Sequence, residues 1–266
     1  VYFRVNPQTL EITHGPYIES LEVFKQHFSR MIWKYGGSND LTLLTRKHNW
    51  NTVMCAMPWE ENDSVVVGTN RAETVLKEVD PFLRRGQGRT ILIAGEPGTG
   101  KTTLARDIAG ECGRTLRVTP EATEDMAAPT FVELVDLIAP DVLLLDDFDR
   151  VAGFWVSRFL QQLEELHQQA KNTGRLVIAT VNNLDMLDTA MKRPGRFDHL
   201  VLIDMPGGED REAILRHYLT TYDVGIEEDD VDTLVKGTEG MPGAYLKLLC
   251  EQLSVADWIN TKDALA

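Results

Sequence analysis

Cysteine is scarce in this chain, with three in 266 residues, at Cys55, Cys112 and Cys250. They are far apart and odd in number, and no two stand in a C-x-x-C spacing, so neither a disulfide framework nor a cysteine metal site is indicated. The six histidines show no ligand spacing either. Reduced thiols of this kind are typical of an intracellular, reducing compartment, which is the localisation we expect.

A long hydrophobic run is also missing. No apolar stretch approaches the roughly 20 residues that cross a bilayer, and the sequence opens without a signal-peptide pattern. The first residue is Val1 and not a methionine. We therefore expect any membrane association of the protein to come from a segment that lies outside this sequence.

Positive charge is in deficit, because 27 Lys and Arg face 41 Asp and Glu, for a net charge of −14. A surface that grips nucleic acid normally carries a basic footprint, so this balance disfavours nucleic acid as a partner. Hydrophobic residues make up 43% and charged residues 26%, as in an ordinary globular protein. The length suits one large domain or two to three small ones.

The chain does contain a phosphate-binding loop. Residues 95–102 read GEPGTGKT and match the pattern G-x-x-x-x-G-K-[ST] at every fixed position, directly after the apolar run 91–94. Glycines let the backbone curl so that its N–H groups face a polyphosphate, and the helix that follows points its positive N-terminus at the anion. Lys101 supplies charge for the β- and γ-phosphates, and Thr102 offers a hydroxyl to Mg²⁺. The predicted phosphate-loop contacts are Gly95, Glu96, Pro97, Gly98, Thr99, Gly100, Lys101, Thr102 and Thr103.

Strand-like and helix-like segments alternate from about residue 64 onward. Apolar runs predict strands at 64–67, 90–94, 115–119, 141–145, 175–180 and 199–203, with helices at 71–83, 101–112, 129–138 and 154–170. Such alternation is typical of a parallel sheet covered on both faces. The fold class we predict is therefore α/β, a phosphate-loop (P-loop) parallel sheet sandwiched by helices.

Two smaller units flank that sheet. Strand-like segments at 2–5 and 9–13, a helical stripe at 17–35 and a hairpin within 41–56 predict a small α+β unit. After Pro206 three helical segments, at 210–222, 228–235 and 243–258, predict a helical lid. We expect three domains: residues 1–62 (α+β), 63–206 (nucleotide-binding) and 207–266 (lid).

Two carboxylates, Asp146 and Asp147, end the apolar run at 142–145. A parallel strand aims an acid at its carboxyl end into the ligand crevice of the sheet. In nucleotidases such an acid holds Mg²⁺ and its neighbour orients the attacking water, and we assign the first role to Asp146 and the second to Asp147. Thr102 and Asp146 thus form the predicted Mg²⁺ site.

Polar residues follow the next strand as well. Asn182 ends the run at 177–181, where an amide could hold the attacking water near the γ-phosphate without adding negative charge. Arg193 and Arg196 flank Pro-Gly in LDTAMKRPGRFD, and guanidinium groups on a rigid turn suit charge neutralisation on a phosphoryl group, including one bound to a neighbouring subunit. The predicted catalytic set is Lys101, Asp146, Asp147, Asn182, Arg193 and Arg196.

The order of these motifs resembles the AAA family of ring ATPases across about residues 64–258. The resemblance implies ATP and Mg²⁺ as cofactors, ATP hydrolysis, and a homo-oligomeric ring of six or seven subunits. It places Asn182 on the sensor-1 asparagine, Arg193 and Arg196 on the arginine-finger positions, and Gly243-Ala244 on the contact near the adenine. Most members carry Asp-Glu where this chain has Asp146-Asp147, a departure that bears on the hydrolysis rate.

Within the family, short segments are similar to the Bcs-type branch, which includes the mitochondrial translocase of the folded Rieske protein. They are NWNTVMCAMPWEENDSVVV, LDDFDR, FLQQLEEL and MLDTAMKRPGRFDHLVLI. The interval 120–129, where threading unfoldases carry an aromatic–apolar–Gly triplet, holds three acids and neither an aromatic residue nor a glycine. This composition disfavours a peptide-threading motor.

These observations lead to an ATP-hydrolysing ring protein that remodels or translocates protein substrates, with ATP bound between subunits. Two alternatives stay open at this point. One is a DNA-directed AAA+ loader or helicase-like ATPase, against which the acidic balance counts. The other is a slow, nucleotide-gated scaffold, which the aspartate at position 147 motivates.

Overall fold

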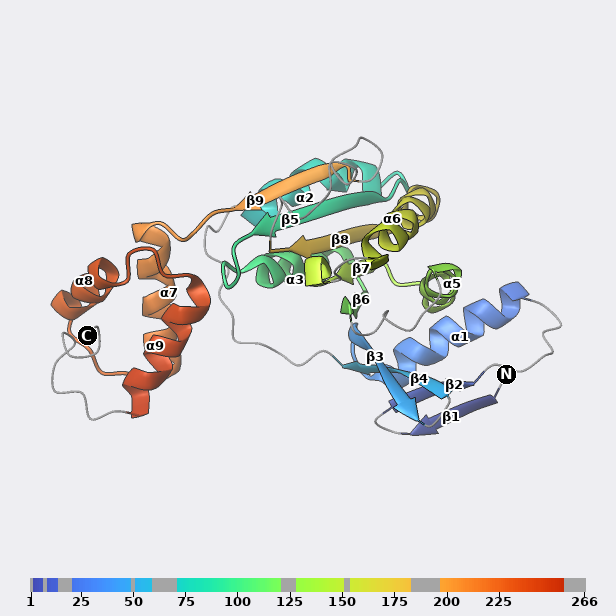
Figure 1. Ribbon diagram of the computed structural model, residues 1–266, viewed down its shortest axis with the longest axis horizontal. Coiled ribbons are helices and arrows are strands. Elements are labelled where there is room, and N and C mark those ends of the chain that lie inside the picture. Colours follow the sequence, from blue (N-terminus) through green and yellow to red (C-terminus); the bar gives the residue numbers. More distant parts are fainter. Residues whose placement is uncertain are drawn as a thin grey trace.

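The computed structural model describes residues 2–6, 9–13, 21–48, 51–58, 71–120, 128–150, 154–182 and 197–255. A seven-stranded sheet crosses the molecule in the order β4-β3-β6-β7-β8-β5-β9 (Figure 1). Its strands are β3 (Asp40–His48), β4 (Asn51–Pro58), β5 (Arg89–Gly95), β6 (Thr115–Val118), β7 (Val142–Leu145), β8 (Leu176–Val181) and β9 (His199–Ile203). All neighbouring pairs are parallel except β3 with β4. The predicted α/β fold is confirmed.

The central strands are apolar because both of their faces are covered. Along β7, Leu143 and Leu145 pack with helices α1 (Leu21–Gly36), α5 (Ala128–Ile138) and α6 (Phe154–Thr173). Val142 and Leu144 point the opposite way and pack with α2 (Arg71–Leu83) and α3 (Lys101–Cys112). Every residue of β7 and β8 is buried, which explains why these strands read as nearly continuous apolar runs, with Thr180 the one polar residue, and not as alternating ones.

Three helices form a separate unit beside the carboxyl ends of the strands, drawn in orange and red in Figure 1. They are α7 (Gly208–Thr221), α8 (Glu228–Gly237) and α9 (Gly243–Val255). This lid has an apolar core of its own, to which Leu215, Leu234 and Leu246 contribute fully buried side chains. The lid meets the phosphate loop directly, because the backbone N–H of Ala244 donates to the carbonyl of Gly98 at 3.1 Å.

The amino-terminal region differs in part from the predicted separate unit. Strands β1 (Tyr2–Asn6) and β2 (Thr9–Thr13) form a two-stranded antiparallel sheet, but the hairpin of β3 and β4 extends the main sheet. Asp40–Leu43 pairs in parallel with Thr115–Val118, so backbone hydrogen bonds run without a break from one region into the other. The domain boundary near residue 62 stays a prediction, and residues 59–70 lie outside the described ranges.

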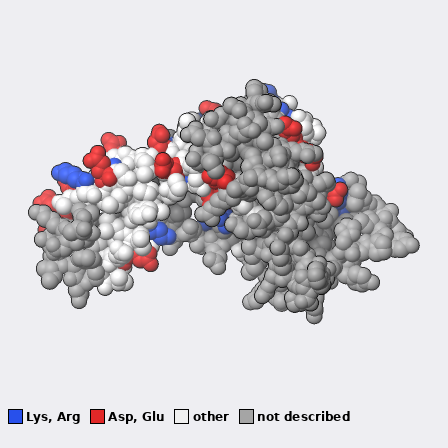
Figure 2. Space-filling view, viewed as in Figure 1, with Lys and Arg blue, Asp and Glu red and all other residues white. Residues whose placement is uncertain are grey.

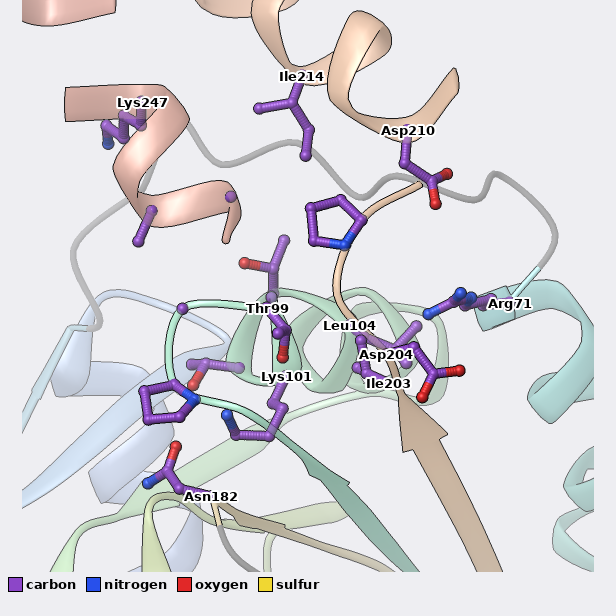
Figure 3. A pocket seen from close by; sticks show the side chains of 18 of the residues that line it. Arg71, Thr99, Lys101, Leu104, Asn182, Ile203, Asp204, Asp210, Ile214 and Lys247 are labelled. Carbon is purple, nitrogen blue, oxygen red and sulfur yellow. The ribbon is translucent and has the colours of Figure 1, made fainter. Parts of the chain in front are cut away.

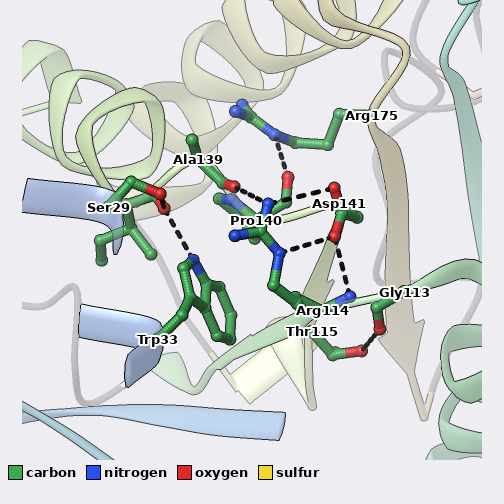
Figure 4. Close-up of polar contacts among 10 residues, drawn as sticks. Ser29, Trp33, Gly113, Arg114, Thr115, Ala139, Pro140, Asp141 and Arg175 are labelled. Carbon is green, nitrogen blue, oxygen red and sulfur yellow. Dashed lines mark hydrogen bonds and ion pairs between the residues drawn. The ribbon is translucent and has the colours of Figure 1, made fainter. Parts of the chain in front are cut away.

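Helix α1 is fixed to the same core. Phe28 and Ile32 are each 1% exposed within the apolar cluster that covers one face of the sheet. The hydroxyl of Ser29 and the indole N–H of Trp33 both donate to the carbonyl of Ile138, at 2.8 and 3.0 Å (Figure 4). That carbonyl ends α5 and has no partner inside its own helix, so α1 satisfies a helix terminus that would otherwise be buried without a donor. Within the described ranges, none of the helices combines the length and the apolarity that a membrane crossing needs.

Candidate nucleotide-binding site

A cavity of about 560 Å³ lies between the carboxyl end of the sheet and the lid. Figure 3 shows Lys101 and Asn182 on the sheet side, with Ile214 and Lys247 on the lid side. Arg71 of α2, Asp204 after β9 and Asp210 of α7 stand at another side. The remaining lining comes largely from the phosphate loop and the start of α3, with Gly243 and Ala244 at the start of α9.

The phosphate loop curls tightly between β5 and α3. Gly98 and Gly100 have φ angles of 78° and 94°, in the left-handed region that glycine adopts without steric cost. A Cβ at Gly98 would also stand 3.0 Å from the Cβ of Ala244. Gly95 serves a different purpose, since a Cβ there would lie 2.3 Å from the carbonyl of Ile203 in β9. The sequence pattern therefore combines a loop requirement with a strand-packing requirement.

Lys101 is the buried cation of the site. It is 4% exposed, and its ammonium donates to the carbonyl of Glu96 at 2.7 Å. Burial lowers the pKa of this ammonium, and nearby carboxylates, chiefly Asp147 and Asp149, oppose part of that effect. A desolvated cation that lines a polar cavity is well suited to a polyphosphate, because the anion supplies the charge that the surrounding protein does not fully compensate.

Asp146 joins three side chains around its carboxylate. It is 1% exposed, and its Oδ1 accepts from the hydroxyls of Thr102 at 2.8 Å and Thr180 at 2.7 Å. Its Oδ2 accepts from Nε and Nη2 of Arg117, at 2.9 and 2.6 Å. The predicted Mg²⁺ pair, Thr102 and Asp146, is thus in direct contact, while Asp146 stands behind Thr102 and does not itself line the cavity.

Asp147 and Asn182 face each other at the edge of the cavity. The amide Nδ2 of Asn182 donates to Oδ1 of Asp147 at 3.3 Å and to Oδ1 of Asp149 at 3.2 Å. The backbone N–H of Asn182 donates to Oδ2 of Asp149 at 2.8 Å. Asp147 has a φ of 55°, a conformation in which aspartate is more common than most other residues. The backbone N–H of Asp147 donates to the hydroxyl of Thr180 at 2.8 Å.

Most of the predicted site residues therefore meet at one place. Lining the cavity are Pro97, Gly98, Thr99, Gly100, Lys101, Thr102, Thr103, Asp147, Asn182, Gly243 and Ala244. Gly95, Glu96 and Asp146 stand next to it without lining it. Arg193 and Arg196 lie outside the described residues, so the arginine-finger assignment stays a prediction.

Sequence reasoning missed several contributors. Arg117 and Thr180 hold Asp146, and Arg71, Tyr218 and Lys247 line the cavity. Arg117 had a signal in the sequence, because an arginine inside the apolar strand TLRV needs an acidic partner nearby. Thr180, Tyr218 and Lys247 sit in ordinary strand and helix patterns, and only the packing of the lid on the core brings the last two to the site.

The residues present fit a nucleoside triphosphate with Mg²⁺. The loop glycines leave its backbone uncovered, Lys101 offers a buried positive charge, and Thr102 with Asp146 offers oxygen ligands of the type that Mg²⁺ prefers. The cavity volume of about 560 Å³ is within the range of small-molecule and cofactor sites.

The chain is similar to known ATPases. The family model of the "ATPase family associated with various cellular activities (AAA)" matches residues 91–205. Similar curated proteins include the ATP-dependent zinc metalloprotease YME1L of Drosophila melanogaster, 32% identical over 230 residues that cover 76% of this chain and 30% of that protein. FtsH 3 of Sorangium cellulosum, with the same enzyme description, is 34% identical over 208 residues, 69% of this chain and 34% of its own.

The chain spans about a third of the length of these relatives. Among solved structures, the AAA domain of FIGL-1 in complex with ADP matches with a TM-score of 0.59 and 25% identity, covering 73% of each chain. Sequence relatives, family model and fold thus converge on an AAA-family ATPase domain within this chain.

Proposed function

We propose that this chain is the motor part of a homo-oligomeric ring that hydrolyses ATP to remodel or translocate protein substrates, with ATP bound between subunits. The observation that carries the proposal is the crevice that gathers Lys101, Thr102, Asp147 and Asn182 beneath the lid. The family supplies ATP hydrolysis and the cofactors ATP and Mg²⁺. The protein-directed role is supported by relatives that are described as ATP-dependent proteases.

Each residue has a role in this proposal. Lys101 binds the β- and γ-phosphates, Thr102 and Asp146 hold Mg²⁺, and Asp147 orients the attacking water with Asn182 beside it. The bound metal supplies charge neutralisation on the phosphates. Because Ala244 of the lid is hydrogen-bonded to Gly98 of the loop, a change at the phosphates alters the contact that sets the lid position.

The neighbouring subunit completes the site in this proposal. Arg193 and Arg196 reach the phosphoryl group from the next member of a ring of six or seven subunits. A guanidinium that arrives in this way is worth a large factor in turnover, about 10³-fold or more. Assembly and hydrolysis are therefore linked, because a lone subunit lacks these two cations at its own nucleotide.

A phosphate-release assay with added protein or added DNA tests the function. We expect a permanently unfolded model protein, reduced and carboxymethylated α-lactalbumin, or a folded iron–sulfur protein to raise ATP turnover several-fold, while double-stranded DNA does not. Turnover that rises with DNA and falls steeply with salt would instead establish the DNA-directed reading. The acidic side chains spread over the described part of the face in Figure 2 favour the first outcome.

The branch within the family is part of the proposal. The Bcs-type reading rests on the short segments quoted from the sequence, whereas the FtsH-type relatives are whole enzymes with a zinc protease. Among the described residues, no group of three or more His, Cys, Asp or Glu side chains is placed to hold a metal ion. The matched residues cover about a third of those enzymes, and the proposal takes up only the ATP-driven part of their activity.

A slow nucleotide-gated scaffold is the second candidate, and Asp147 favours it. An aspartate is one methylene shorter than the glutamate of most family members, and here its carboxylate is also within 3.3 Å of the Asn182 amide. If the protein is a deliberately slow switch, Asp147→Glu speeds phosphate release by the assembled protein. Unchanged or slower release in that variant removes the support for this candidate.

We also propose an intracellular, reducing location. Its support is the state of the two cysteines that the structure describes in full, which are both free thiols. Burial raises the pKa of Cys112 to about 11 and that of Cys250 to about 12. Both side chains therefore stay protonated and unreactive at neutral pH.

A further inference from the structure

The carboxylate of Asp146 has all of its acceptor positions filled by the protein. An ionised carboxylate offers about four lone-pair positions on its two oxygens. Two hydroxyls, from Thr102 and Thr180, take those of Oδ1, and two N–H groups of Arg117 take those of Oδ2. A water bound to Mg²⁺ would share Asp146 with donors that the protein already supplies.

Arg117 is the charged donor to Asp146. Its guanidinium grips Oδ2 through two N–H groups, as an ion pair with N···O of 2.6 Å, with 25% of the arginine side chain and 2% of the aspartate side chain exposed. Charge-assisted hydrogen bonds of this kind are about twice as strong as neutral ones. Arg117 also stands inside the sheet, opposite Thr42 of β3 and Leu144 of β7, so its backbone is held on both sides.

Thr102 is the donor on the side of the metal site. Its hydroxyl is the group that the phosphate-loop pattern offers to Mg²⁺, and an oxygen that binds a metal through a lone pair can still donate its hydrogen to Oδ1 of Asp146. Oδ1 of Asp146 therefore faces the metal site while Oδ2 is held by Arg117. The arginine therefore fixes which oxygen of Asp146 is available and keeps its positive charge close to the place where the divalent ion binds.

We propose that Arg117 is a positioning residue that orients Asp146 and, through its charge, sets the Mg²⁺ concentration at which the nucleotide site loads. This inference rests on the proposed Mg²⁺ role of Asp146. A positive charge that pairs with Asp146 would repel a divalent ion held at the same carboxylate, even where water screens the two charges. The site accordingly takes up Mg²⁺ less readily than it would with a neutral residue at position 117, so metal loading responds to the free Mg²⁺ concentration.

Binding of a fluorescent, non-hydrolysable ATP analogue, titrated with Mg²⁺, tests the proposal without turnover. In Arg117→Gln, which keeps a hydrogen-bond donor but removes the charge, we expect the half-saturating Mg²⁺ concentration to fall about tenfold. Arg117→Lys keeps the charge and is expected to stay close to the wild-type value. A value for Arg117→Gln that is unchanged or higher, or an equal shift in Arg117→Lys, overturns the proposal.

The matched control is Arg114→Gln. It removes the same charge and also breaks an arginine–aspartate pair, with Asp141 at 2.9 Å, but at the opposite end of β7. We expect no shift in the Mg²⁺ requirement, and a shift equal to that of Arg117→Gln would reject a local effect. Melting temperatures of all variants, measured alongside, show that each is folded at the temperature of the titration.

Asp146→Asn separates this inference from the proposal beneath it. If Asp146 helps to hold Mg²⁺, the half-saturating Mg²⁺ concentration of the Asp146→Asn variant rises at least about tenfold, because the amide offers the metal no charge. No change in Asp146→Asn rejects the proposed metal role and the inference together. A clear rise in Asp146→Asn with no shift in Arg117→Gln rejects the inference alone.

Discussion

At the scale of single residues, the site contains groups whose burial has an energetic cost when no ligand is bound. Lys101 is the main example, since burial lowers the pKa of its ammonium and the folded protein thus disfavours the charged form. Charges of this kind are retained for binding and not for stability. Asp147 carries a different cost, because it keeps a φ of 55°, in the left-handed region that most residues avoid.

Lys101→Met is expected to weaken ATP binding by at least about 100-fold while leaving the ligand-free protein equally stable or more stable. The methionine replaces a desolvated cation by an apolar chain of similar length. Equilibrium binding of labelled ATP and thermal unfolding without nucleotide measure the two effects. A variant that binds ATP normally would show that the lysine does not contact the phosphates, and Lys77→Met on the exposed face of α2 controls for charge alone.

Asp147→Asn is expected to lower the ATP turnover number about 100-fold or more and to change the affinity for ATP less than about threefold. Asparagine tolerates the left-handed backbone as well as aspartate does, so the fold is kept while the carboxylate that orients water is lost. Single-turnover phosphate release and binding of labelled ATP separate the two quantities. Equal losses in both would place Asp147 in binding and not in catalysis.

At the scale of elements, a buried polar cluster joins α6 to strand β5 and to the residue that precedes β9. Nδ1 of His167 is 2.9 Å from the hydroxyl of Thr90, and Asp198 accepts from the hydroxyl and the backbone N–H of Thr90 at 3.1 and 3.0 Å. His167 is fully buried. Burial lowers its pKa, and Asp198 opposes that change only in part.

The pH dependence of stability follows from the lowered pKa of His167. Because the folded state disfavours protonated His167, the unfolded chain binds more protons once the pH falls below the ordinary histidine pKa of about 6.5. The contribution of neutral His167 to the free energy of unfolding is therefore fully present above that pH. It is lost as the pH falls from there through the lower folded-state pKa. Urea unfolding between pH 7.5 and 5 measures the decline, and we expect His167→Gln to reduce it. A decline of the same size in the variant would assign the effect to other groups.

The attachment of α1 gives a second element-scale prediction. Phe28 is 1% exposed in the cluster that spans α1, α5, α6 and the sheet, and truncating a buried phenylalanine leaves a cavity. Phe28→Ala should therefore lower the free energy of unfolding by about 3–5 kcal/mol in the same cooperative transition as the nucleotide-binding core. Urea unfolding of the wild type and the variant tests it. A separate early transition for the amino-terminal region, with the core unchanged, would instead support an independent domain at 1–62.

The elements that sequence reasoning located well are those with local signals. The phosphate loop, the apolar strands β5, β7 and β8 and the lid helices each carry their own pattern, and their bounds lie close to those expected. The place of β3 beside β6 had no such signal, because a parallel pairing between Leu41 and Leu116 depends on residues far apart in the chain. The same reason hid the contact of Arg117 with Asp146, whereas Asp146 and Thr102 were predictable from the motifs alone.

At the scale of the whole molecule, the nucleotide-binding cavity lies where two bodies meet. The α/β core supplies the phosphate loop and the acids, and the lid supplies Gly243 and Ala244 across the cavity. A backbone hydrogen bond from Ala244 to Gly98 connects the lid to the loop. In the proposed ring, the third contribution comes from a second copy of the chain, and the site is incomplete without it.

Mixing two inactive variants is the most direct test of that shared site. Lys101→Met is expected to bind ATP too weakly to turn it over but keeps its arginines, whereas Arg193→Ala/Arg196→Ala is expected to bind ATP but lacks them. If the arginines act across the interface, an equal mixture regains turnover at about a quarter of its interfaces, as random assembly of a ring predicts. A mixture no more active than the two variants measured separately would show that the site is not shared between subunits.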